Sequence, residues 1–526
     1  MSILRTLRTV RHLKPVQVVN RAWRTLRRPA PRLDPPPPLR AIVALAAPCI
    51  RPESLLGGDR VRLLGVARSL ERAGDWNRAD WPKLWLYALH YHDGLRAEDT
   101  AAKLKLAFVE RWLAENPPLG GNGWEPYPLS LRIVNWIYWL IREQRADPSI
   151  LASLAVQVRA LENQLEYHLL GNHLWANAKA LIFAGLFFEG AEAERWLSTG
   201  LRIGEAQRKE QFLADGGHFE LSPTYHQLMT EDLLDLINLS TAASRPLPPE
   251  WTDTAQRSLA WLAVMTRPDG TVPLLNDAFE AMAPVTAALL DYAARLGLDR
   301  PSPPASGLTL LANSGYARWR GDDLDVWADV GRIGPDYIPG HGHADCLSFE
   351  LFAAGRPLIV DSGVSTYDQG DRRLLERGTP AHNSVTLGDA DQAEIWASFR
   401  VGRRPNIIDL AVTGQTLAAE HDGYARLGAR HRRAFEFGPR SLIIRDEIRR
   451  TRPGPTATAR FHFAPTEEVE RSGGEVCVGP LRIAWPVDSQ PRLEECRIAA
   501  GFGATEAAHC LAVDFNDTLV TRITLK

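Results

Sequence analysis

The sequence is poor in cysteine, has no long apolar run and carries no excess of charge of either sign. Its five cysteines are scattered and form no Cys-x-x-Cys pair, which excludes a disulfide framework and a thiolate zinc site. The best candidate span, residues 41–50, contains Pro48 and is far shorter than the roughly 20 apolar residues that cross a bilayer. With 61 Lys and Arg against 63 Asp and Glu, the net charge is −2, which argues against an electrostatic nucleic-acid-binding protein.

Residues 1–40 form a strongly basic segment. They hold ten Lys and Arg and a single acidic residue, Asp34, but no apolar core of the kind that marks a secretory signal. We expect a basic arm with an amphipathic helix over residues 4–26 on the protein surface, although an organellar transit peptide is similarly rich in Arg and poor in acidic residues. Because no signal peptide is clear, a cytoplasmic location is favoured over a periplasmic one.

The rest of the 526 residues divides into two parts with different periodicity. From about residue 60 to residue 297, apolar residues recur at i, i+3, i+4 and i+7, in segments separated by Gly-, Pro- or Asn-rich breaks. After the Pro- and Ser-rich stretch 300–307 the period becomes two. This pattern predicts a helical domain over residues 41–305, an α/α bundle or toroid, followed by an antiparallel β-sandwich over residues 306–526.

Two polar clusters at the starts of expected helices could carry chemistry. The first is Asn172-His173, although Asn172 would also serve well as a helix N-cap. The second is residues 215–226, which gather glycines, histidines, carboxylates and Tyr225. Its structural interpretation is a turn with a capping box and a tyrosine of the helix core.

Two further clusters lie in the expected β region. In the segment His341-Gly-His343, alternate histidines point to opposite faces of an extended chain, so one can face a metal and the other a cleft. Asp361 and His382 follow, and imidazole and carboxylate are suitable zinc ligands. Their wide spacing is no compact metal motif, so spacing alone leaves this set open.

Together these clusters resemble the heparinase II/III family of polysaccharide lyases. The resemblance runs in order from about residue 80 to residue 400. It rests on WEPYPLSLRIVNW (124–136), GNHLWANAKALIFAGLFF (171–188), DGGHFELSPTYH (215–226), HGHADCLSFELFAAGRPLIVDSG (341–363), Arg377 and HNS (382–384). It implies an incomplete α/α toroid followed by an antiparallel β-sandwich, in agreement with the periodicity.

The resemblance also implies a reaction, in which a uronic-acid polysaccharide is cut by β-elimination to give 4,5-unsaturated uronate ends. Glycosaminoglycans such as heparan sulfate, hyaluronan or chondroitin, and alginate, are all open as substrates. Asn172, with His173, would neutralise the uronate carboxylate and favour an enolate-like intermediate. Tyr225 matches the catalytic tyrosine, and His341 matches a second catalytic position, which could be the base for the opposite C5 configuration.

The resemblance further implies binding residues and a metal. Substrate-binding positions would be Arg132, Asn135, Trp136, His218 and Arg377. The ligands of one divalent ion, usually zinc, with manganese as an alternative, would be His343, Asp361 and His382. That ion would be structural and would fix the His341 loop. One departure is Ala176, where many relatives carry Glu, and this puts close transfer of substrate specificity in doubt.

Three other interpretations fit parts of the sequence. The string HGHAD at 341–345 fits the HxHxD pattern of metallo-β-lactamase-type hydrolases, but Cys346 follows it and the preceding chain is helical. A non-catalytic polysaccharide-binding or assembly protein could retain the scaffold, and residues 13–26 resemble family members associated with polysaccharide synthesis. A glycoside hydrolase would need two facing carboxylates, and Glu220 and Asp215 have no equally persuasive partner.

Overall fold

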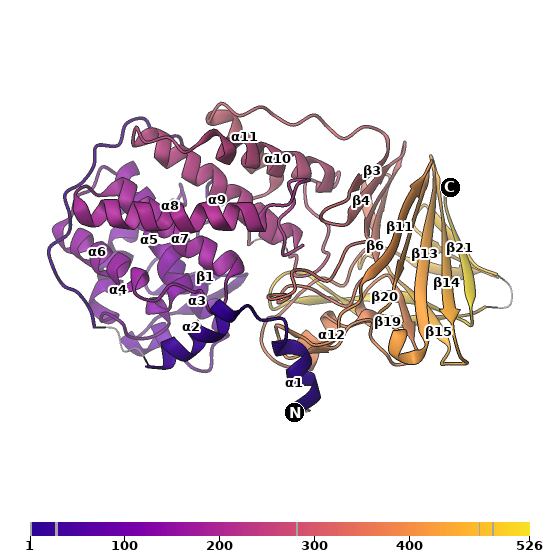
Figure 1. Cartoon of the computed structure of the whole chain (residues 1–526). Coiled ribbons are helices and arrows are strands. Elements are labelled where there is room, and N and C mark those ends of the chain that lie inside the picture. The colour runs from indigo at the N-terminus through magenta and orange to yellow at the C-terminus, as the bar shows by residue number, and fades with distance from the viewer. Residues whose placement is uncertain (1–2, 27–29, 280–281, 473, 487–488) are drawn as a thin grey trace.

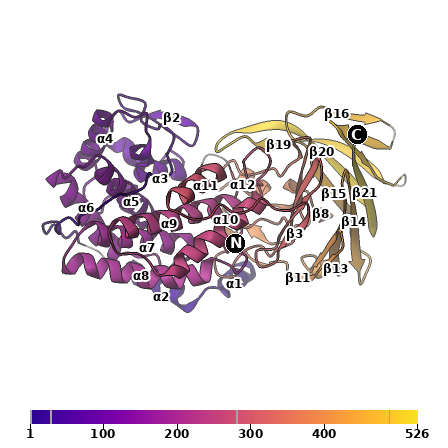
Figure 2. The same ribbon diagram turned by 90° about the horizontal axis from the view of Figure 1, so that it is seen from above.

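The computed structural model describes residues 3–26, 30–279, 282–472, 474–486 and 489–526, and they form a helical half and a sheet half that lie side by side (Figures 1 and 2). Helices of the first half are α3 (Lys83–Tyr91), α4 (Ala102–Glu115), α5 (Pro126–Arg142), α6 (Pro148–Glu162), α7 (Gly171–Phe187), α8 (Ala191–Gln211), α9 (Pro223–Ala242), α10 (Pro249–Met265) and α11 (Thr286–Arg295). A small hairpin, β1 (Arg60–Leu63) and β2 (Val66–Ser69), precedes them.

The helical half is organised around α5 and α7, which are buried along almost their whole length. Proline stands in the first turn of α5, α6, α9 and α10, where its fixed φ suits the helix and its missing N–H costs no hydrogen bond. Packing of α7 against α8 is close because Gly200 faces Ile182 and leaves no room for a Cβ. Among the described helices, none is long and apolar enough to cross a bilayer.

The sheet half is antiparallel throughout its named pairings. One sheet has the order β3-β4-β5-β6-β7, a second β11-β12-β13-β14-β21-β18-β17-β16, and a third β19-β20-β15-β8. The first contains β3 (Gly307–Leu311), β4 (Tyr316–Arg320), β5 (Leu324–Asp329), β6 (Phe349–Ala353) and β7 (Arg356–Ile359). One apolar cluster, with members such as Val326, Phe435 and Phe461, joins the three sheets.

The second and third sheets are formed by the later strands. They are β8 (Val385–Leu387), β11 (Ile407–Thr413), β12 (Thr416–His421), β13 (Ala429–Gly438), β14 (Ser441–Arg450), β15 (Ala457–His462), β16 (Val469–Ser472), β17 (Glu475–Val478), β18 (Leu481–Ala484), β19 (Gln490–Ala499), β20 (Thr505–Phe515) and β21 (Thr518–Leu525). Helix α12 (Asp371–Glu376) lies between β7 and β8 in sequence, and a short ribbon of β9 (Ile395–Trp396) and β10 (Arg400–Val401) lies between β8 and β11. The predicted order, toroid and then antiparallel sheets, is confirmed.

The basic N-terminal arm contains two helices rather than the single expected one. Helix α1 (Ile3–Val10) and helix α2 (Pro15–Leu26) are separated at residues 11–14, where Pro15 starts the second helix. In Figure 1, α2 lies under the helical half and α1 lies under the junction with the sheets. The following residues continue along the helical half, where Arg40 N–H donates to Phe187 O.

Candidate active site

Asn172, Tyr225 and His341, which are far apart in the sequence, come together between the two halves. Asn172 lies in the first turn of α7, and Tyr225 lies in the first turn of α9, which Ser222 caps by accepting the Tyr225 N–H. His341 lies in the loop between β5 and β6. The structure thus brings together side chains from three of the predicted polar clusters.

Tyr225 and His341 form a stacked pair. Their ring centroids are 3.8 Å apart, with 30° between the ring planes. The hydroxyl of Tyr225 lies 3.4 Å from that of Tyr367. Burial raises the pKa of Tyr225 well above its usual value, so the phenol keeps its proton at neutral pH.

Asn172 lies beside a buried carboxyl group, Glu220. The backbone N–H of Asn172 donates to Glu220 Oε1 at 2.8 Å, and this approach requires Gly171, whose added Cβ would lie 2.5 Å from the same oxygen. Glu220 Oε2 lies 3.4 Å from His341 Nε2. Burial raises the pKa of Glu220, which favours its neutral form.

Asn172 is not a helix cap, so the structural alternative for this residue is wrong. Helix α7 begins at Gly171, and the N-cap position is Leu170, which has φ 66° and no side-chain cap. Positive φ values at Leu170 and Gly171 turn the chain sharply into the helix. The side-chain oxygen of Asn172 is buried without a hydrogen-bond partner among the described residues.

His173 is held by a carboxylate from the preceding loop. Its Nδ1 lies 3.0 Å from Glu166 Oε1, and its ring lies 4.5 Å from the ring of Tyr127. Burial alone would lower the pKa of His173, but the carboxylate of Glu166 raises it above its usual value. With 29% of its side chain exposed, His173 is accessible to a substrate.

Asp277 is the central residue that the sequence did not point to. Its carboxylate lies 2.9 Å from His341 Nδ1 and 2.8 Å from His343 Nε2. It also accepts hydrogen bonds from both terminal nitrogens of Arg373, at 2.5 and 2.7 Å. Asp277 and Arg373 are fully buried. Its only sequence signal was the polar pair Asn276-Asp277 after an apolar segment, in a region that reads as a loop.

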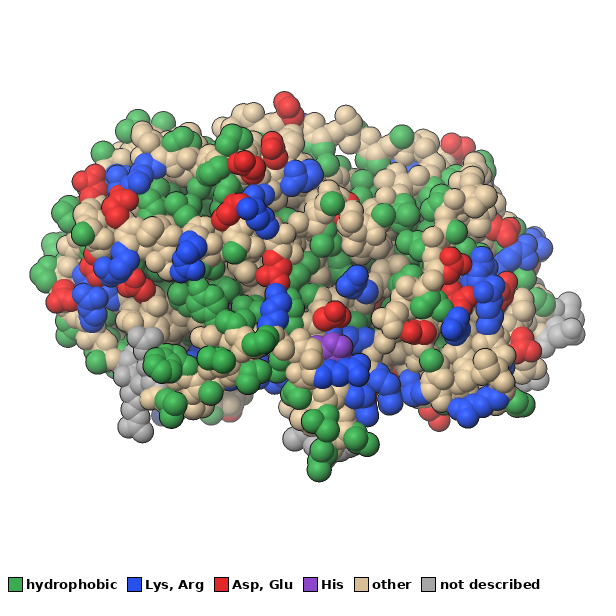
Figure 3. Space-filling view, viewed as in Figure 1, with side chains coloured by type: hydrophobic (Ala, Val, Ile, Leu, Met, Phe, Trp, Pro, Cys, Tyr) green, Lys and Arg blue, Asp and Glu red, His purple; other side chains and the backbone are tan. Residues whose placement is uncertain are grey.

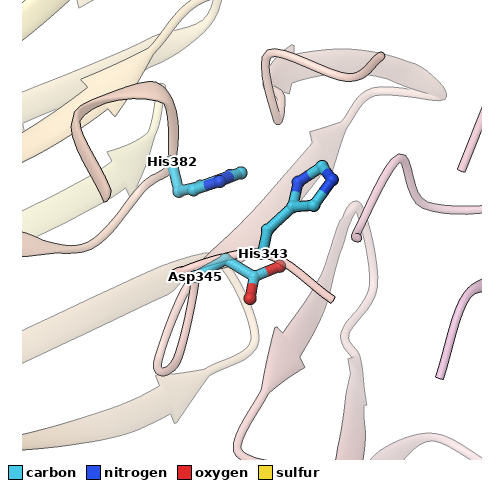
Figure 4. A group of neighbouring side chains, drawn as sticks. All are labelled: His343, Asp345 and His382. Atoms are coloured by element: carbon cyan, nitrogen blue, oxygen red, sulfur yellow. The ribbon is translucent and has the colours of Figure 1, made fainter. Parts of the chain in front are cut away.

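A second group of buried side chains contacts Asp277 through His343 and could hold a metal ion. Ligand atoms of His343, Asp345 and His382 lie within 4.8 Å of one another, and all three residues are buried (Figure 4). His343 Nδ1 and His382 Nε2 are buried without a hydrogen-bond partner in the described part of the chain. Two unpartnered imidazole nitrogens beside a carboxylate fit the donor preferences of a divalent cation such as zinc.

The pKa values of His343, Asp345 and His382 are shifted in different directions. Burial lowers the pKa of His343 to about 3 and raises that of Asp345 to about 6. Burial alone would lower the pKa of His382, but the carboxylate of Asp361 raises it to about 9. Asp361 Oδ2 lies 2.8 Å from His382 Nδ1, an arrangement that orients the ring, and a direct bond from Asp361 to a metal stays a prediction.

Two of the expected substrate-binding residues lie in the core of the helical half, and their binding roles stay predictions. Arg132 is fully buried over the ring of Trp112, and its guanidinium donates to Gln157 Oε1 and to the carbonyls of His90 and Gly123. Trp136 is also fully buried and donates to His92 Nδ1. Arg132 and Trp136 therefore help to hold the helices of this half together.

The other three expected binding residues are also buried, and their binding roles stay predictions. Asn135 donates to Tyr91 O and Asp93 Oδ1, and His218 Nε2 lies 2.9 Å from Gln211 Oε1. Arg377 donates to the carbonyl oxygens of Gly342 and Ser398. Through Gly342 it holds the loop that carries His341.

Fold and site together define a two-domain protein of the toroid-plus-sandwich class. A model of the heparinase II/III N-terminus matches residues 112–296, and a model of the heparinase II/III-like C-terminal domain matches residues 303–515. The chain therefore belongs to the heparinase II/III family.

Relatives agree with this membership. The chain is 28% identical over 306 residues to a heparin-sulfate lyase of Bacteroides stercoris, covering 54% of this chain and 44% of that protein. It is 30% identical over 241 residues to a heparin-sulfate lyase of Pedobacter heparinus, covering 41% and 36%. The matched regions thus span about half or less of these two relatives.

Solved structures show the same fold. A crystal structure of heparinase III superposes with a TM-score of 0.72 at 20% identity and covers 87% of this chain and 80% of that one. Another heparinase III structure superposes with a TM-score of 0.65 at 19% identity, covering 85% and 80%.

Proposed function

We propose that this protein cleaves a uronic-acid-containing polysaccharide by β-elimination. The stacked pair of Tyr225 and His341 carries the proposal, because elimination needs a proton acceptor and a proton donor close together. The two matched family domains and the heparin-sulfate lyase relatives support it. The activity assigns the enzyme to the carbon–oxygen lyases that act on polysaccharides.

Elimination removes the C5 proton of the uronate, breaks the bond between C4 and the glycosidic oxygen, and forms a C4=C5 double bond. Asp277 accepts the Nδ1–H of His341, which leaves the lone pair of Nε2 to take the C5 proton. Tyr225, kept protonated by burial, gives its proton to the departing oxygen. This division makes His341 the base and Tyr225 the acid.

The C5 proton becomes acidic only when the neighbouring carboxylate is neutralised. Asn172 lies in the first turn of α7, where the helix dipole favours an anion. His173, whose pKa is raised by Glu166, adds a donor at the same place. These groups would hold the uronate carboxylate and stabilise the enolate-like intermediate.

The substrate is proposed to be a glycosaminoglycan, with heparan sulfate first because the relatives are named as heparin-sulfate lyases. Hyaluronan, chondroitin and alginate contain uronic acid too and follow as candidates. The recognised chemistry in each case is a uronate carboxylate next to a glycosidic oxygen.

We also propose that His343, Asp345 and His382 hold one divalent cation, with zinc favoured by the two imidazoles. When bound, the ion would join the loop that carries His341, through His343 and Asp345, to His382. The residues of this loop then keep His341 in contact with Asp277 and Tyr225.

Near-ultraviolet absorbance tests the proposal, because elimination creates a conjugated unsaturated uronate and hydrolysis does not. The protein is incubated with heparan sulfate, heparin, hyaluronan, chondroitin sulfate and alginate. Tyr225→Phe should lower the initial rate about 100-fold or more, whereas Tyr138→Phe, which removes another buried hydroxyl remote from His341, should keep it. New reducing ends without absorbance would indicate a hydrolase, and neither signal on any polymer would contradict the proposal.

A further inference from the structure

Helix α1 is turned with its polar side toward the protein and its apolar side toward solvent. Arg8 Nε lies 2.7 Å from Glu394 Oε2, and Trp396 donates to Thr9 Oγ1 at 3.0 Å. Arg5 lies over the ring of Trp396. The polar contacts of α1 are thus made with the segment that contains β9, in the sheet half.

Helix α2 and the turn before it have the same orientation on the helical half. Gln17 is 1% exposed and donates to Leu169 O, and Lys14 pairs with Glu210 and lies over the ring of Tyr337. Arg21 donates to His168 O. The buried side of α2 is therefore polar, which is the reverse of an ordinary surface helix.

The outward sides of both helices are apolar. On α1 and α2 the spacing of these residues is that of one helix side. Their exposed fractions are Ile3 78%, Leu4 65%, Leu7 55%, Val10 40%, Val16 37%, Val19 64%, Trp23 58% and Leu26 79%. In Figure 3 hydrophobic side chains gather along the lower edge of the molecule, where Figure 1 places α1 and α2.

The borders of this face are positively charged. Residues 3–26 contain six Lys and Arg and no Asp or Glu. Arg11, Arg21 and Arg24 have no carboxylate within ion-pair distance in the described ranges. Burial lowers the pKa of Arg21, and the nearby Arg400 lowers it further, so the sheet half adds positive charge beside the helices.

We propose that the outward face of α1 and α2 docks on the surface of a phospholipid bilayer that contains anionic lipid. An apolar face with Leu, Val and Trp, bordered by arginines and free of acidic groups, matches the chemistry of an interfacial helix. A neutral protein partner would leave the surplus arginines without a counter-charge. Because the face is made by short helices held on the body, the protein lies on the bilayer without spanning it.

Docking would place the active site near the bilayer. Helix α1 contacts Glu394 and Trp396. Phe399 follows them in the chain, and its ring lies 6.1 Å from that of His341. Tyr337, whose ring contacts the ammonium of Lys14, is four residues before His341. The bilayer would thus lie against the edge of the protein where the loops of the site begin.

Sedimentation with vesicles tests this proposal on the full chain. We expect binding to vesicles of phosphatidylcholine with phosphatidylglycerol and about tenfold or more weaker binding to phosphatidylcholine alone. Double replacement V19S/W23S should weaken binding to the anionic vesicles about tenfold or more. I408S/V412S, which changes two exposed apolar residues on β11, should leave it unchanged.

Charge is tested separately with R11Q/R24Q, which should reduce the preference for anionic vesicles and the sensitivity to salt. Unchanged far-ultraviolet circular dichroism and thermal midpoint show that each variant is folded. Equal binding by V19S/W23S and the original protein, or no binding to either vesicle at low salt, would overturn the proposal. A dimer in vesicle-free solution that V19S/W23S converts to monomer would also overturn it, since a second copy would then cover this face.

Discussion

The carboxylate of Asp277 lies 2.9 Å from His341 Nδ1, and this contact fixes the imidazole against Tyr225. The same carboxylate contacts His343, a member of the group that could hold a metal. Asp277 therefore links the proposed base to the proposed metal site, and the buried Arg373 keeps it ionised.

Replacement of Asp277 by Asn should abolish turnover and destabilise the fold. It removes the charge opposite Arg373 inside the protein, which costs about 3 to 5 kcal/mol of unfolding free energy. Asp446→Asn is the matched control, because Asp446 is a buried carboxylate that contacts Arg433 and His431 in the sheet half. Urea unfolding and initial rates should show similar destabilisation of both variants but loss of activity only in Asp277→Asn. Equal activity of the two variants would separate Asp277 from the mechanism.

Glu220 should tolerate an amide better than truncation. Because burial raises its pKa, Gln resembles the neutral acid and can still accept the Asn172 N–H. We expect kcat/KM of Glu220→Gln to fall by about tenfold or less, and that of Glu220→Ala by about 100-fold, since the Asn172 N–H is then left unpaired. A loss in Glu220→Gln as large as in Glu220→Ala would show that an ionised carboxylate is needed.

The pair of His173 and Glu166 should make stability depend on pH in a defined window. The pKa of His173 is raised, so its contribution is complete below about pH 6.5 and is lost as pH rises through its folded value. The pKa of Glu166 is lowered, so its contribution is complete above about pH 4.3 and is lost at more acid pH. Glu166→Gln should therefore destabilise most between these values, as measured by urea unfolding at several pH values. A difference that grows steadily above pH 8 would contradict the pairing.

Metal content should follow the carboxylates around His382. Asp361→Ala should lower metal content and thermal stability together, because Asp361 either binds the ion or orients His382. Asp345→Ala should do the same, because its carboxylate lies with His343 and His382. Elemental analysis measures the metal content of the two purified variants. The carboxylate whose replacement leaves less metal is identified as the ligand. Full occupancy in both variants would dismiss the site.

The sequence predicted the order of domains because periodicity is a local property. Apolar spacing distinguishes the helices before Arg295 from the strands after Gly307. Through the family resemblance it also predicted catalytic roles for Tyr225 and His341, whose rings lie 3.8 Å apart in the structure. It could not predict Asp277, since that carboxylate reaches His341 and Arg373 only after two distant loops meet.

The burial of Arg132 and Trp136 could not be predicted from the sequence. Arg132 and Trp136 lie in a motif shared with the family, but a motif does not state which side of a helix faces a cleft. In the structure α5 is buried on nearly all sides, and both side chains point into the domain. The inverted orientation of α1 and α2 was equally hidden, because amphipathic spacing predicts two faces without saying which one faces inward.

Elimination by the pair of Tyr225 and His341 differs from hydrolysis in the masses of the products. Digestion of a defined heparan sulfate oligosaccharide is followed by mass spectrometry. Elimination gives two fragments whose masses sum to that of the substrate, and Tyr225→Phe should form them about 100-fold or more slowly. Fragments whose masses sum to the substrate plus one water would show hydrolysis and would contradict it.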